Sequence, residues 1–346
     1  MPTPVRARPL PWLPARWPRA LRWGIGVVLS LVLAWEALSI AYAPLPAPTL
    51  RLAVAVAFAG FGLWALWRSP VRWPMAVVAV LVAGWALAWA AIEPSHDRDW
   101  RPEVAVMARV AIDGDRARIS GYRDFEYRTV DDFDPHWRER EIALSKISGM
   151  DFYVSYWREG PVAHTFLSFE IEGEDPVAVS IETRPEKGEG FEPIASLFKN
   201  FELVYVVGDE RDIVKVRSNH RDEQVFMYHT NLSADAARNL FLVYARRINE
   251  LADAPEFYHL LSNSCTINIV RYANRVGRSG RLDIRHVLNG WSDRYLYRSG
   301  VVDTSLPFDV LRARSVINEA AQAAADAPNF PERIRQGRPM PEGRMR

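Results

Sequence analysis

The residue best suited to chemistry is Cys265, the only cysteine of the chain. It follows the polar stretch 262–264 and begins a helical pattern, TINIVRYANRV, that ends at Gly277. At a helix N-terminus the free backbone amides and the helix dipole favour thiolate over thiol. A single cysteine cannot form an intramolecular disulfide. These residues alone leave two roles open, a reactive nucleophile or a small buried hydrophobic side chain.

A thiol nucleophile needs a base, and His164 is the histidine best placed to supply one. Strand-like alternation over 163–171 separates an apolar face from the face that carries His164. On the next predicted strand, 177–183, Glu182 lies on the small and polar face. If the two strands pair, Glu182 can orient the imidazole and stabilise its cation. The alternative for Glu182 is an ion pair with Arg184 or another arginine.

The chain has seven histidines, and the other six fit solvated or structural positions better than catalytic ones. A neutral, hydrogen-bonded role is expected for His229, which ends a predicted strand. The remaining ones are His96, His136, His220, His259 and His286. The sequence gives no reason to expect a metal or a cofactor.

The elements that must position these residues are strands followed by helices, which predicts an α+β domain with an antiparallel sheet. Short β-branched or aromatic runs between turn residues occupy 152–157, 164–171, 177–183, 203–207, 213–217 and 225–229. From Ser233, a good N-cap, the period changes to that of an amphipathic helix ending before Pro255. A further helix is predicted within 307–325.

Three apolar segments near the N-terminus predict membrane-spanning helices. At about 1.5 Å per residue, Gly24–Ala43 and Trp73–Ile92 can cross a hydrocarbon core of about 30 Å. The shorter segment Leu52–Trp67 is counted as a span because Arg51 can extend to one surface and its tryptophans suit the other.

Positive charge sets the predicted orientation. Arginines precede the first span and fill the second loop, whereas the first loop, 43–49, is uncharged. The N-terminus is therefore expected in the cytoplasm and everything after Glu93 in the periplasm. The formal net charge of +1 gives no electrostatic reason to expect nucleic acid as a partner.

These observations predict five parts of the chain. They are a cytoplasmic N-terminus (1–23), a three-helix transmembrane region (24–92), a linker and domain entry (93–121), a periplasmic domain (122–326) and a disordered tail (327–346) rich in Pro, Arg and Gly.

Four stretches resemble the N-terminal periplasmic domain of the Lnb family, and the resemblance covers roughly 122–302. They are DFYVSYWREGPVAHTFLSFEI, VSIETRPEKGE, YVVGDERDIVKVRSN and FYHLLSNSCTINIVRYANR. One motif departs from the family, which usually has Asn directly before its Cys, because Ser264 stands here after Asn263. The family looks like a circularly permuted relative of the papain and NlpC-type thiol enzymes, in which the histidine strand precedes the cysteine helix. The resemblance therefore implies a permuted papain-like fold.

The resemblance also implies lipid chemistry. Lnb itself is a lipoprotein intramolecular transacylase, so an acyltransferase that works through a Cys265 thioester on membrane lipid or lipoprotein is expected at the inner membrane. Further residues that match the motifs are expected to bind substrate or to support the site: Arg184, Asp209, Arg211, Arg217 and Asn263. Two alternatives stay open, an envelope peptidase or amidase of the NlpC type and a non-catalytic envelope binding module.

Overall fold

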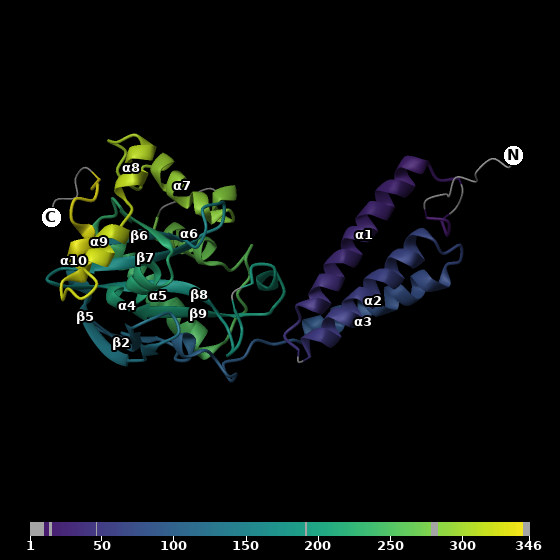
Figure 1. The fold of residues 1–346 in the computed structure, drawn as a ribbon, viewed down its shortest axis with the longest axis horizontal. Coiled ribbons are helices and arrows are strands. Elements are labelled where there is room, and N and C mark those ends of the chain that lie inside the picture. The colour runs from purple at the N-terminus through teal and green to yellow at the C-terminus, as the bar shows by residue number, and fades with distance from the viewer. Residues whose placement is uncertain (1–9, 14–15, 46, 191, 278–282, 342–346) are drawn as a thin grey trace. The chain divides into compact units, whose positions relative to one another are not determined.

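The computed structural model describes residues 10–13, 16–45, 47–190, 192–277 and 283–341 (Figure 1). The chain divides into two compact units, and each is considered by itself. One unit comprises 1–94 with 192–201, and the other comprises 95–191 with 202–346. The segment 192–201 therefore belongs to the first unit, although in sequence it separates two strands of the second.

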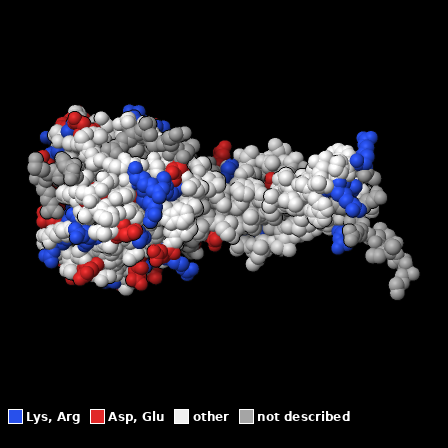
Figure 2. Space-filling view, turned by 90° about the horizontal axis from the view of Figure 1, so that it is seen from above, with Lys and Arg blue, Asp and Glu red and all other residues white. Residues whose placement is uncertain are grey.

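The first unit contains three helices that are long and apolar enough to cross a membrane. They are α1 (Arg19–Ala41), α2 (Pro48–Trp67) and α3 (Trp73–Ala90). The three predicted spans are thus confirmed as helices, and the middle one begins earlier than predicted because Pro48 suits the first helical turn. Figure 2 shows Lys and Arg gathered at one end of this unit and few charges along its sides.

The inserted segment packs onto the ends of these helices. The Phe198 ring lies 4.7 Å from that of Trp35 and 6.4 Å from that of Trp89, measured between centroids. The Lys199 ammonium donates to the backbone oxygens of Trp89 at 2.8 Å and Ile92 at 2.9 Å. Since Lys199 satisfies carbonyls at the end of α3, the insertion stabilises that helix end.

The second unit is built on a mixed but mostly antiparallel sheet, as predicted. Its strand order is β1-β2-β9-β8-β7-β6-β10, with β5 also paired to β2, and only the β2–β9 pair among those described is parallel. The strands are β1 (Arg109–Asp113), β2 (Arg116–Arg123), β5 (Trp137–Ala143), β6 (Ile147–Tyr156), β7 (His164–Ile171), β8 (Glu174–Arg184), β9 (Glu202–Gly208) and β10 (Gln224–His229). The short strands β3 (Glu126–Tyr127) and β4 (Phe133–Asp134) form a separate pair.

Helices cover both faces of the sheet. On one face Phe169 of β7 meets Phe241 edge-on, with ring centroids 5.3 Å apart. On the other face Phe166 stacks on Tyr153 at 4.7 Å and joins a buried cluster that includes Phe330. The helices are α4 (Glu210–Ile213), α5 (Ala234–Asp253), α6 (Cys265–Arg275), α7 (Ser292–Arg298), α8 (Phe308–Arg314), α9 (Asn318–Ala323) and α10 (Phe330–Arg335).

One predicted strand, 213–217, is wrong. These residues end α4 and begin a π-helical turn, η4 (Val216–His220). Ile213 and Val214 are fully buried against the sheet rather than paired within it. Asp209 starts the helix, because its carboxylate accepts the backbone N–H of Arg211 at 2.9 Å. The β-branched composition matched a strand, whereas tertiary packing favoured a helix.

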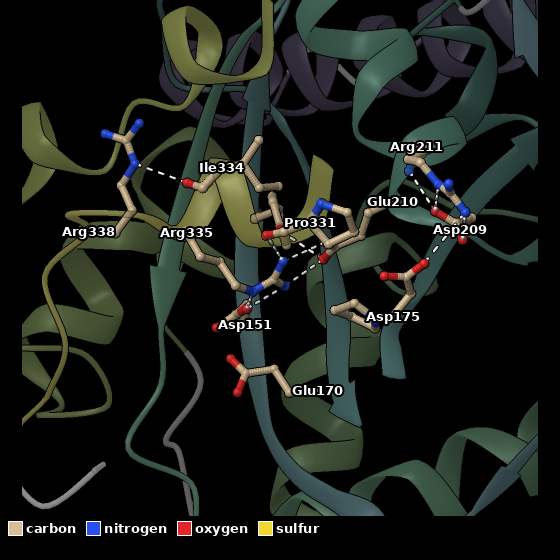
Figure 3. A network of polar contacts seen from close by, with 12 residues as sticks. Asp151, Glu170, Asp175, Asp209, Glu210, Arg211, Pro331, Ile334, Arg335 and Arg338 are labelled. Carbon is tan, nitrogen blue, oxygen red and sulfur yellow. Dashed lines mark hydrogen bonds and ion pairs between the residues drawn. The ribbon is translucent and has the colours of Figure 1, made fainter. Parts of the chain in front are cut away.

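The predicted disorder of 327–346 is also wrong for the described residues up to 341. Helix α10 buries Phe330 and places Arg335 between two carboxylates (Figure 3). The guanidinium lies 2.8 Å from Asp151 Oδ2 and 2.6 Å from Glu210 Oε2. Both acids are fully buried, so Arg335 compensates charges that would otherwise be costly.

The sheet begins before the predicted domain boundary at 122. Strands β1 and β2 lie within the stretch expected to be a linker and domain entry. No strand was predicted there, and Arg109, Arg116 and Arg118 are exposed on these two strands. The domain therefore includes at least residues from Arg109 onward.

Candidate active site

Cys265 is the first residue of α6, as predicted, and the residue is only 2% exposed. Ser264 precedes it in an extended conformation and makes no side-chain cap, so the first-turn amides are not bonded by a capping side chain. His164 and Thr165 both lie close enough to the Cys265 sulfur to lower the pKa of the thiol. The helix start and the beginning of β7 thus meet at the thiol.

His164 is the first residue of β7, and its imidazole contacts the neighbouring strand. Nε2 lies 2.7 Å from the Ser180 hydroxyl of the neighbouring strand β8. The same imidazole acts on the Cys265 thiol, whose pKa it lowers. The Ser180 hydroxyl therefore holds the imidazole in one orientation.

Glu182 lies behind this pair, as the predicted strand pairing allows. In the antiparallel register Phe166 stands opposite Ser180. Two residues further along each strand, on the same face of the sheet, His164 comes level with Glu182. The Glu182 carboxylate is 3.9 Å from His164 Nε2 but 2.6 Å from Arg217 Nη2. Glu182 thus supports the imidazole by charge, while its direct hydrogen bond goes to the arginine.

The charges of this cluster favour an ionised thiol. Burial alone would raise the pKa of Cys265, but the hydrogen bond and charge of His164 outweigh it and lower the pKa from 9.0 to about 6. Burial would likewise raise the pKa of Glu182, yet the charges of Arg217 and His164 hold it well below its usual value. At neutral pH the site therefore contains a thiolate and a carboxylate on either side of the imidazole.

Further side chains reach the sulfur, Thr266 among them, and none was singled out from the sequence. Asn289 donates from Nδ2 to Cys265 Sγ at 3.5 Å, and its Oδ1 accepts the N–H of Ala163 at 2.9 Å. The Tyr258 hydroxyl is buried and lies near the backbone and the sulfur of Cys265. Asn289 is 24 residues from the cysteine in a short 3-10 turn, so only the folded chain reveals its role.

The position of Asn289 depends on the glycine beside it. A Cβ at Gly290 would clash with the backbone oxygen of Gly160. The N–H of Gly290 also donates to Pro161 at 2.9 Å. The missing side chain therefore lets this turn approach the entry of β7 closely enough for Asn289 to reach the thiol.

These groups line a cavity of about 170 Å³. Its polar lining includes the predicted residues Cys265, His164, Glu182 and Arg217. Arg221 and Glu223 add further charge to the same wall. The cavity can admit a polar group next to the Cys265 thiol, but it is too small to hold a large ligand.

Four other predicted residues do not line this cavity. Arg184 is buried elsewhere, donating to the backbone oxygens of Val104 and Ala105 and stacking on Trp100. Asp209 and Arg211 pair with each other at the start of α4.

Asn263, the fourth, is held in its own loop. Its amide donates to the backbone oxygen of Phe257 at 3.0 Å and accepts from Asn268 at 3.0 Å. These four residues therefore support the fold, whereas Arg217 is the predicted supporting residue that reaches the site.

Within the described part of the chain, Asp151, Glu170 and His229 form a cluster whose donor set could hold a metal ion. Asp151 Oδ1 lies 2.6 Å from His229 Nδ1, and its other oxygen is bonded by Arg335. Burial opposes the His229 cation, but the two acids raise its pKa to about 9. The expected neutral state of His229 is therefore wrong. The cations of His229 and Arg335 already compensate the acids that a metal ion would need as ligands.

Residues 133–299 match the family model of the Lnb N-terminal periplasmic domain. This span contains His164, Glu182, Cys265 and Asn289, and the match confirms the resemblance seen in the motifs. No curated protein and no solved structure matches the chain.

Proposed function

We propose that this protein, whose residues 133–299 match the family model of the Lnb N-terminal periplasmic domain, is a membrane-anchored thiol acyltransferase. It would act on acyl groups of lipid or lipoprotein through a thioester on Cys265. The observation that carries the proposal is the contact of Cys265 with His164 at a helix N-terminus, with Ser180 and Glu182 behind the imidazole. Lowered thiol pKa values are found at sites of nucleophilic catalysis more often than at structural cysteines.

In the first half-reaction the Cys265 sulfur attacks the carbonyl carbon of an ester, and His164 holds the proton of the thiol. The tetrahedral oxyanion is stabilised by donors that lie beside the sulfur, the Asn289 amide and the Tyr258 hydroxyl. The bond from the carbonyl carbon to the ester oxygen then breaks. The leaving alcohol takes the proton from His164, and the acyl group remains on sulfur as a thioester.

In the second half-reaction an amine, a hydroxyl or water attacks the thioester. His164 removes the proton of the attacking group, and the thiolate leaves. An amine or hydroxyl acceptor gives transacylation, whereas water gives hydrolysis. The acceptor therefore decides the product, while the residues of the site serve both outcomes.

Three apolar helices and the periplasmic description of the family support a location at the inner membrane. The arginines at one end of the helical unit favour a cytoplasmic N-terminus and a periplasmic second unit. Tethering to a bilayer raises the local concentration of an acyl donor whose ester lies at the interface. A lipid or lipoprotein donor fits this arrangement better than a freely diffusing substrate.

One observation favours the second candidate, an envelope peptidase of the NlpC type. The walls of the cavity beside Cys265 carry the charged groups Arg217, Arg221 and Glu223, which suit the polar backbone of a peptide. The same nucleophile and base would attack an amide carbonyl. Cleavage of muropeptides without any transfer of lipid acyl groups would favour this candidate.

The test uses the full-length protein in detergent, a lipid or diacyl lipopeptide with a labelled acyl chain, and a muropeptide mixture in parallel. Cys265→Ala and His164→Ala should each abolish release or transfer of the label, because a nucleophile and its base act as a unit. His136→Ala is the matched control, since this histidine is exposed. Full acyl transfer by the Cys265→Ala protein would overturn the thiol mechanism.

A further inference from the structure

The cavity beside Cys265 contains a guanidinium whose donors are not used by the protein. Arg221 lines this cavity together with Cys265, and its side chain is 28% exposed. Among the described residues the Arg221 side chain makes no hydrogen bond, and its ion pair with Glu223 is loose, with Nη1 4.0 Å from Oε1. A guanidinium carries several N–H donors in a planar fork. Arg221 can therefore donate to a ligand in the cavity.

The acids that line this cavity have closer partners than Arg221. Glu182 accepts a hydrogen bond from Arg217 Nη2 at 2.6 Å. Glu223 accepts one from the Ser155 hydroxyl at 2.5 Å, through the oxygen that does not face Arg221. Since both carboxylates are held by other donors, neither of them occupies the fork of the Arg221 guanidinium.

The turn that carries Arg221 is held firmly in place. Arg221 follows the π-helical turn η4, and its N–H closes that turn by donating to the backbone oxygen of Val216 at 2.9 Å. The Asn318 amide, at the start of α9, donates to the backbone oxygens of Ser218 at 3.3 Å and Glu223 at 2.8 Å, on either side of Arg221. Single π-helical turns are frequent at functional sites. A fixed backbone limits the entropy lost when a ligand binds.

The charges around Arg221 favour an anionic ligand. Partial burial and the nearby Arg217 cation lower the pKa of Arg221, and the acids Glu182 and Glu223 offset this effect only in part. A lowered pKa means that the charged guanidinium is less stable here than in water. An anion beside it would restore that stability, and the oxygens of phosphate or carboxylate match its planar fork.

The small size of the cavity limits where that anion can lie in the substrate. Cys265 and Arg221 share a volume of about 170 Å³, so the anion must be close to the carbonyl that the thiol attacks. In a glycerophospholipid only the glycerol carbons and their oxygens separate the phosphate from an ester carbonyl, whereas a diacyl lipopeptide has no phosphate there. The three apolar helices can also keep phospholipids at high local concentration. A lipid phosphate fits these conditions.

We propose that Arg221 binds the phosphate of a glycerophospholipid acyl donor and thereby selects phospholipid over lipoprotein as the donor. The assignment rests on the proposed function, because it names the donor for the same thiol. The guanidinium donates to the phosphate oxygens while the neighbouring ester lies at Cys265. Loss of such charge-assisted hydrogen bonds weakens binding by about tenfold to a hundredfold.

The test is protection of Cys265 from iodoacetamide in the full-length protein, in neutral detergent at pH 7. The probes are a short-chain, ether-linked phosphatidylglycerol and the dialkylglycerol with the same chains, which lacks the phosphate. Neither probe can be turned over, because ether bonds replace the esters. Since the chain has one cysteine, every adduct reports on this cavity. Half protection of the wild type should need about tenfold less of the phospholipid than of the dialkylglycerol.

Three variants assign this preference to the guanidinium. Arg221→Gln should bring the two half-protection concentrations to within about twofold of each other, because the donor fork and its charge are lost. Arg221→Lys keeps the charge without the fork and should give an intermediate ratio. Arg246→Gln, the same change at an exposed position of α5, is the matched control and should keep the wild-type ratio. A purely structural role of Arg221 would weaken protection by both probes alike, and an unchanged ratio in Arg221→Gln would overturn the proposal.

Equal protection of the wild type by the two probes would also overturn the proposal, and that result needs no substituted protein. Inorganic phosphate that protects at the same concentration as the phospholipid would overturn the lipid assignment in favour of a free-phosphate site. Protection by a muropeptide but not by the phospholipid would overturn it in favour of a peptide carboxylate. The readout involves no turnover. Preferential protection by the phospholipid in a protein that never forms a thioester would therefore refute the proposed function and leave this site standing.

Discussion

Replacing His164 by alanine should move the pH at which Cys265 becomes reactive. Burial of the thiol is retained in this variant, but the hydrogen bond and charge that lower its pKa to about 6 are lost. The thiol pKa should therefore return to 9 or above. The lost stabilisation of the thiolate amounts to about 4 kcal/mol.

The magnitude follows from the thiolate fraction. At pH 6 about half of the wild-type thiol is ionised, against about one in a thousand for a thiol of pKa 9. A more basic thiolate is intrinsically more nucleophilic, by about twentyfold for this difference in pKa. The alkylation rate at pH 6 should therefore fall about 25-fold in the variant.

The assay is iodoacetamide labelling of the full-length protein between pH 5 and 10, followed by mass spectrometry. The chain has one cysteine, so every adduct reports on Cys265. The pH profile of each protein is compared with its own plateau, which cancels differences in access to the buried sulfur. The His136→Ala protein should keep the wild-type midpoint near pH 6. A wild-type midpoint near 9, or a midpoint unchanged in His164→Ala, would refute the reasoning.

Three further outcomes are expected. A phosphatase reporter fused after Asp97 should be active because that position is outside the cytoplasm, and a fluorescent reporter fused at Pro70 should be active because that position is inside. The reverse pattern would contradict the proposed topology. Ser180→Ala and Glu182→Gln should each lower acyl transfer by about tenfold to a hundredfold while leaving measurable activity, because both act by orienting or supporting the imidazole. Wild-type rates in both variants would show that neither Ser180 nor Glu182 orients or supports the imidazole. The buried acids raise the pKa of His229 to about 9 in the folded protein. The ion pair of His229 with these acids therefore stabilises the fold fully below pH 6.5, the usual pKa of histidine, and this stabilisation is lost as the pH rises through 9. The melting temperature of the wild type should therefore fall between pH 7 and 10 more steeply than that of His229→Gln, and parallel curves would refute this.

Local sequence pattern predicted the parts of the site that depend on local geometry. Alternation over 164–171 matched the bounds of β7, and the polar stretch before Cys265 matched the start of α6. The same alternation placed His164 and Glu182 on one side of adjacent strands, where the observed register brings them level. Period and capping are properties of a few neighbouring residues, so they are visible in the chain itself.

Contacts between distant segments were not predictable in this way. The imidazole lies 2.7 Å from Ser180 and 3.9 Å from Glu182. Both distances depend on side-chain rotamers and on the ion pair that Glu182 forms with Arg217. Arg335 lies in a stretch with the composition of a disordered tail, yet it pairs with Asp151, 184 residues away. Burial of opposite charges by tertiary packing outweighs local composition, and no short window of sequence contains that information.

The most direct test of the central claim is the mass of the intact protein after incubation with an ester-linked acyl donor. The full-length protein in detergent should gain the mass of one acyl chain, labile to hydroxylamine as a thioester is. Peptide mapping should place the chain on Cys265, and the adduct should be absent from Cys265→Ala. Turnover of the donor with the acyl chain on another residue, or with no covalent intermediate on Cys265 under any quench condition, would contradict the account.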